Sequence, residues 1–168
     1  MENKCGIQER LTIHIYDEKG NLIDTREPYN GSLLQRIKKA LGLTRCTNDI
    51  VLNGGLEDVA AFIADRYGYI EIGSDATAPS ANDTGVIAPL LSRSEASTTI
   101  ATTFYDNDTV RFSAIFEPEY QITVREAGIC KDASSGEGDI TFARETFAAF
   151  TANAGAAFTL TWDVVVMR

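Results

Sequence analysis

The sequence predicts a mainly β fold, an antiparallel β-sandwich with two short amphipathic helices in its N-terminal half. Several segments alternate apolar and polar residues with a period of two, which is typical of half-buried strands. Clusters of Gly, Asn, Asp and Ser separate these segments and mark turns. Two further segments repeat their apolar residues with a helical period. Many short strands with a few helices indicate a two-layer β architecture.

The composition fits a single domain over residues 1–168, with the helices confined to about residues 31–66. Its 44% hydrophobic and 23% charged residues are ordinary for a globular protein. A chain of this length buries roughly 70% of its unfolded surface, which is enough for one sizeable core. No linker long enough to divide the chain is visible.

The acidic balance excludes some partners. A net charge of −9 argues against nucleic-acid binding, because phosphates require clustered Lys and Arg. The N-terminal residues MENKCGIQER lack the apolar core of a signal peptide, and no run approaches the roughly 20 apolar residues of a membrane span. We expect synthesis in the cytoplasm and neither nucleic acid nor membrane as a partner.

Cysteine and histidine usage gives no metal site. Cys5, Cys46 and Cys130 are far apart and odd in number, and His14 is the only histidine. No zinc-binding spacing arises from this set. We expect free thiols and no cofactor, with one disulfide and a leftover thiol as the alternative.

The N-terminal third should contain a hairpin and the two helices. Leu11, Ile13 and Ile15 alternate with polar residues, and a turn at 17–21 leads into a return strand that stops before Pro28. The first helix should begin at the capping box of Ser32 and Gln35 and end near Gly42. The second should follow Asn53-Gly54-Gly55 and place four residues against the sheet: Leu56, Val59, Ala60 and Ile63.

The remaining chain should be strands joined by loops. The expected strands are Tyr69–Gly73, Ser97–Tyr105, Thr109–Phe116, Tyr120–Ala127, Ile140–Arg144 and Phe158–Val166. Their inward residues should be Val110, Phe112, Ala114, Phe116, Tyr120, Ile122, Val124, Phe158, Leu160, Trp162, Val164 and Val166. Ser74–Thr84 and Lys131–Asp139 should be loops, Gly85–Ser92 either a helical turn or an extended crossing, and Ala148–Ala157 either a loop or a contact between subunits.

Catalytic patterns are absent from the sequence. A Ser-His-Asp or Cys-His arrangement would need His14, which falls on the polar face of a predicted strand. The acidic stretches at Asp106–Asp108 and Asp132–Asp139 offer oxygen ligands for calcium but lack the EF-hand spacing, so we interpret them as solvated turns. We therefore expect a protein that is not an enzyme.

One polar pair is expected in the interior. Arg125 and Glu126 must face opposite sides of their strand, and Glu126 shares its parity with Ile122 and Val124. A buried carboxylate needs a partner, and Arg144 on the neighbouring strand is our candidate. The alternative is that Gly128 marks a bulge that turns Glu126 to solvent.

The order of several short motifs resembles a known family. These motifs are IEIGS at 70–74, TAP at 77–79, DT at 83–84, REAGI at 125–129, FAR at 142–144 and LTW at 160–162. The chain resembles small virion structural proteins of tailed bacteriophages and archaeal viruses, of the tail-fibre, collar or virion-associated type. Its motif residues are Gly73, Pro79, Asp83, Arg125, Glu126, Gly128, Arg144 and Trp162.

The resemblance implies a non-enzymatic subunit of the neck, collar, tail or head decoration, located in the virion and bound to copies of itself and to other virion proteins. A receptor- or carbohydrate-binding module of a viral fibre is the alternative, with Tyr67, Tyr69 and Tyr105 as candidate exposed aromatics. A cytoplasmic enzyme with an unrecognised carboxylate site is the second alternative.

Overall fold

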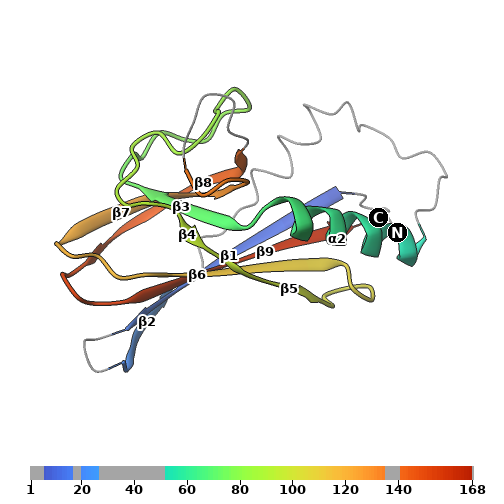
Figure 1. The fold of residues 1–168 in the computed structure, drawn as a ribbon, viewed down its shortest axis with the longest axis horizontal. Coiled ribbons are helices and arrows are strands. Elements are labelled where there is room, and N and C mark those ends of the chain that lie inside the picture. Colours follow the sequence, from blue (N-terminus) through green and yellow to red (C-terminus); the bar gives the residue numbers. More distant parts are fainter. Residues whose placement is uncertain (1–5, 17–19, 27–51, 135–140, 168) are drawn as a thin grey trace.

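The chain forms two antiparallel sheets and one helix (Figure 1). A computed structural model describes residues 6–16, 20–26, 52–134 and 141–167. The five-stranded sheet has the order β2-β1-β9-β6-β5, with bounds Leu22–Arg26, Gly6–Tyr16, Phe158–Met167, Thr109–Phe116 and Ser97–Ala101. The four-stranded sheet has the order β4-β3-β7-β8, with bounds Ser94–Glu95, Tyr69–Gly73, Ile122–Cys130 and Thr141–Ala152.

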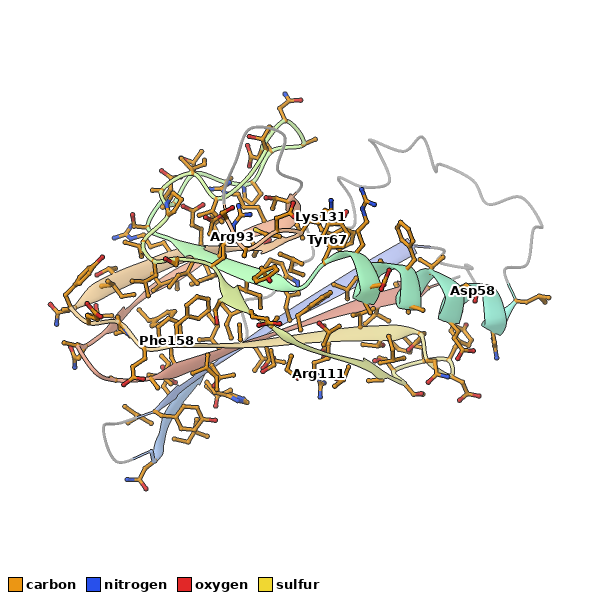
Figure 2. All side chains as sticks on the ribbon, viewed as in Figure 1. Asp58, Tyr67, Arg93, Arg111, Lys131 and Phe158 are labelled. Carbon is orange, nitrogen blue, oxygen red and sulfur yellow. The ribbon has the colours of Figure 1, made fainter. Side chains whose placement is uncertain are left out.

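Side chains from the facing sides of the two sheets form one hydrophobic core. Phe112, Phe158 and Trp162 from the five-stranded sheet have no exposed surface, and neither have Ile70, Ile72 and Ile129 from the other sheet. Phe158 lies between the two sheets (Figure 2). Its ring packs edge-on against the ring of Phe150, with the two ring centroids 5.2 Å apart. Aromatic and branched side chains supply most of the area that this core removes from water.

The helix α2 (Asn53–Arg66) covers the part of the five-stranded sheet that the four-stranded sheet leaves open (Figure 1). Leu56, Ala60 and Ile63 are buried, as the helical period predicts. Val59 is 41% exposed, so the prediction that it faces the sheet is wrong. The helix begins at Asn53, and the Gly-Gly pair therefore lies within its first turn and not before it.

The expectation of two helices is not borne out, since the described residues contain only α2. The other expected helix, at residues 32–42, lies outside the described residues. The predicted hairpin is confirmed by the antiparallel pairing of β1 with β2. The predicted alternation of β6 and of β9 is also confirmed, and Val165 is buried as well, so the end of β9 is covered on both faces.

Three strand predictions need correction. Tyr120 is 56% exposed and precedes β7, so it does not point inward. The strand predicted from Ser97 ends at Ala101, because the backbone after it turns to donate hydrogen bonds to Asp108. The strand predicted to end at Arg144 continues to Ala152, because β8 pairs with β7 along its length.

The core face of α2 yields a stability prediction. Replacing Ile63, which is 4% exposed, with alanine should lower the free energy of unfolding by about 2–4 kcal/mol through lost burial and a cavity. The neighbouring Phe62 is 61% exposed, so Phe62→Ala should change the free energy of unfolding by less than about 1 kcal/mol. Chemical denaturation of both variants measures the difference, and equal effects would contradict the packing of α2.

Candidate functional site: an ionic network beneath a surface loop

Glu126 lies on the outer face of the four-stranded sheet, beneath the loop that connects β3 to β4. Paired residues of neighbouring strands share a face, and Glu126 pairs with Gly73 while Ala127 pairs with Ile72 of the core. Val124 also belongs to the core, so the alternation shifts by one residue between Val124 and Ala127. The pairing with β8 is irregular at this point, as in a β-bulge.

The carboxylate of Glu126 accepts four hydrogen bonds although its side chain is fully buried. Its Oε1 accepts the backbone N–H of Asp75 at 3.2 Å and that of Ala88 at 2.9 Å. Its Oε2 accepts the N–H of Ile87 at 3.1 Å and the Nε–H of Arg144 at 2.7 Å. A charge without exposure requires this degree of compensation. Glu126 thereby ties the beginning of the loop to its end.

Arg144 holds the middle of the same loop. Its Nη1 donates to Asp83 Oδ2 at 2.8 Å, and its Nη2 donates to the carbonyl of Thr77 at 3.1 Å. Asp75 Oδ1 lies 3.5 Å from Nη2. Hydrogen bonds from Thr77 lower the pKa of Asp75 most strongly, partial burial opposes them, and the Arg144 charge adds to the lowering. Arg144 therefore links a carboxylate of the sheet to two acidic residues of the loop.

Two glycines allow the loop to approach the sheet closely. A Cβ atom at Gly73 would meet Glu126 Oε1 and would lie 2.7 Å from the carbonyl of Ala88. A Cβ atom at Gly128 would lie 3.1 Å from a methyl group of Val86 and 3.2 Å from the carbonyl of Ala143. The Val86 side chain is 9% exposed. Glycine is thus needed where the loop backbone and Val86 rest on the sheet.

A second buried ion pair holds the end of the loop. Arg93 Nη2 donates to Glu71 Oε2 at 3.0 Å, and both side chains are almost fully buried. Arg93 Nη1 also donates to the carbonyls of Asp132 and Ser134, which follow β7. The buried thiol of Cys130 lies 3.9 Å from Glu71 Oε2. Arg93 therefore joins the β3–β4 loop to the chain segment that leaves β7.

Asp108 organises a second loop, between β5 and β6, in the same manner. Its carboxylate accepts the backbone N–H groups of Thr103, Phe104 and Tyr105 at 2.8–2.9 Å and the hydroxyl of Thr109 at 2.8 Å. Burial raises the pKa of Asp108, but these four hydrogen bonds outweigh burial and hold the pKa below its usual value.

The structure brings together five of the eight motif residues identified in the sequence: Gly73, Asp83, Glu126, Gly128 and Arg144. Pro79 lies in the loop above them, half-buried, whereas Arg125 is exposed. Trp162 lies in the core between the sheets, away from this network. The predicted pair of Glu126 with Arg144 is present, but it lies under the loop and not between the sheets.

Sequence reasoning missed Glu71, Arg93, Asp75 and Asp108. Glu71 alternates with Ile70 and Ile72, so a period-two reading places it on a solvated face. Only the loop that folds back over this face buries Glu71. Asp108 is the middle residue of an Asn-Asp-Thr sequence at 107–109, and the same sequence surrounds Asp83 at 82–84. This turn-forming sequence could have marked Asp108 as an acceptor for nearby backbone N–H groups.

Other candidate sites have different outcomes. The interpretation of Asp106–Asp108 as a solvated turn is wrong for Asp108, which is fully buried and whose two oxygens accept protein hydrogen bonds. Residues 135–139 of the second stretch lie outside the described residues. Among the described residues, no group of three or more His, Cys, Asp or Glu side chains could hold a metal ion, and no helix could span a membrane.

The three tyrosines considered for carbohydrate binding are not fully exposed. Tyr67 is buried, while Tyr69 and Tyr105 are half-buried.

The contacts at this site join loop backbone to the sheets. The polar atoms of Glu126 and Asp108 accept hydrogen bonds from loop backbone, and both arginines donate to backbone carbonyls of loops. Such contacts fix the shape of a surface. Comparison with protein-family models, with curated proteins and with solved structures finds no match for this chain.

The Glu126 network predicts a large effect of one substitution. Glu126→Ala should lower the free energy of unfolding by about 3–5 kcal/mol, because Arg144 loses its strongest partner and three backbone N–H groups lose their acceptor. Limited proteolysis should also cut the variant within residues 74–92 sooner than the wild type. Arg125→Ala, at the exposed neighbour, is the control and should have little effect. Unchanged thermal stability of Glu126→Ala would count against the network.

The lowered pKa of Asp108 predicts a pH dependence. A carboxylate whose folded pKa lies below its unfolded value of about 3.9 stabilises the fold above that pH, and this contribution disappears as pH falls through the folded pKa. Asp108→Asn should therefore be less stable than the wild type at pH 7, and the difference should shrink below about pH 4. Denaturation curves of both proteins between neutral and acidic pH measure this difference in stability. A difference that does not change with pH would contradict the lowered pKa of Asp108.

Proposed function

We propose that this protein is a non-enzymatic β-sandwich subunit of a tailed-virus particle, located in the neck, collar, tail or head decoration. It acts by symmetric association with copies of itself and by contact with other virion proteins. The order of motifs from Gly73 to Trp162 suggests the family, and the mainly β fold with two antiparallel sheets is compatible with it.

The observation that carries this proposal is the Glu126–Arg144 network. It buries two opposite charges beneath the β3–β4 loop and uses them to fix that loop. A loop held in one conformation loses little conformational entropy when a partner binds. This suits a subunit whose role is to present a constant surface to its neighbours.

The middle of the β3–β4 loop carries no charge, which suits contact with acidic neighbours. Residues 76–82, Ala-Thr-Ala-Pro-Ser-Ala-Asn, contain no charged side chain, and all except Pro79 are exposed. The whole chain carries a net charge of −9, which makes its copies repel one another. The uncharged stretch 76–82 is a surface that an acidic virion protein can approach without a direct charge conflict.

Purified particles test the proposed function. Density-purified virions produced from the genome that encodes this chain should contain it in a fixed number of copies that matches the particle symmetry. Quantitative mass spectrometry of the particles measures this number, with a non-structural protein of the same genome as the control. Absence of the chain from the particles would overturn the proposal.

A further inference from the structure

The open edges of the two sheets differ in how they are protected against pairing. Natural sheets protect exposed edges with short strands, bulges or charged residues, because unpaired backbone groups attract other strands. At one end of the four-stranded sheet, β4 has only two residues; at the other end, β8 pairs irregularly with β7 and carries Arg144 and Glu145. In the five-stranded sheet, the edge strand β2 carries the exposed Asp24.

The remaining edge strand, β5, has none of these protective features. Its sequence is Ser-Thr-Thr-Ile-Ala, without charge, proline or glycine. It pairs with β6 through all five residues with no irregularity, and no other described strand lies on its far side. Ile100 at this edge is 41% exposed although it pairs with the fully buried Val110 of the core face. A regular, uncharged edge with a partly exposed core residue is suited to receive another strand.

The sequence of β5 is compatible with pairing to its own copy. In an antiparallel register centred on Thr99, Thr99 faces Thr99 of the second copy, Thr98 faces Ile100 and Ser97 faces Ala101. Threonine pairs and pairs of β-branched residues are favourable across strands. No like charges meet in this register, which matters for a chain with a net charge of −9. The equivalent register of β2 centred on Asp24 would oppose two aspartates.

We propose that β5 is the strand through which two copies of this chain associate, by symmetric antiparallel pairing about Thr99 that joins their five-stranded sheets. This inference rests on the proposed function, since it names the surface used for self-association. It assigns a two-fold interface to the β5 edge, and the pairing would cover the exposed part of Ile100.

Disulfide trapping tests the register. In a chain whose Cys5 and Cys46 are replaced by serine, Thr99→Cys should form a disulfide-linked dimer under mild oxidation. The two Cα atoms would lie about 4.5–5.5 Å apart, within the range that a disulfide bridges. Ser97→Cys is the matched control on the same strand and the same face. Its counterparts would lie roughly 14 Å apart, so it should remain unlinked.

A charge substitution tests the interface without cysteine. Thr99→Lys places two like charges opposite each other and should weaken association by about tenfold or more, measured as the dimer dissociation constant by analytical ultracentrifugation. Ile115→Lys is the control, because Ile115 is 66% exposed in β6 away from this edge, and it should leave the constant unchanged.

The outcomes separate this inference from the proposed function. If the wild type associates but Thr99→Cys does not cross-link and Thr99→Lys associates normally, the β5 pairing is overturned and self-association stands. A wild type that stays monomeric at the highest attainable concentration also overturns the pairing. The presence of the chain in purified particles then decides the proposed function independently.

Discussion

The Glu126 carboxylate is the interaction on which the outer layer of this protein depends. One side chain on β7 accepts hydrogen bonds from three loop backbone N–H groups and from Arg144, and thereby joins both ends of the β3–β4 loop to the sheet. A loop of this length without secondary structure is uncommon in a compact domain. The loop keeps its conformation because its backbone N–H groups donate to the Glu126 carboxylate, which β7 holds in place.

The buried ion pair matters mainly through the cost of breaking it. A buried ion pair gains little net stability over apolar packing, but removal of one partner leaves a costly charge in the interior. The network therefore holds the loop in one conformation, and loss of either charged partner leaves buried polar groups without their hydrogen bonds. Glu71 with Arg93 repeats the principle at the end of the same loop, and Asp108 with its three backbone donors repeats it at the β5–β6 loop. The sheets thus position charged groups that in turn position the surface.

Some of the site follows from sequence and some does not. The pairing of Glu126 with Arg144 could be predicted, because a buried carboxylate needs a cation on an adjacent strand, but the burial comes from the covering loop and not from an inward parity. The face could not be predicted, since the parity argument assumed an unbroken alternation and the strand shifts by one residue between Val124 and Ala127. Glu71 was hidden for a related reason, as its cover comes from a loop distant in sequence.

The amino-acid pattern predicts the strands whose burial alternates, such as Thr109–Phe116 and Phe158–Val166, and the core residues Leu56, Ala60 and Ile63 of α2. These patterns are local, because side-chain direction repeats with the period of the element. Three features become visible only in the folded chain: which sheet each strand joins, the exposure of Val59 and Tyr120, and the return of the chain after β3 over Glu71 and Glu126. Those outcomes depend on contacts between residues far apart in the chain, and no local period encodes them.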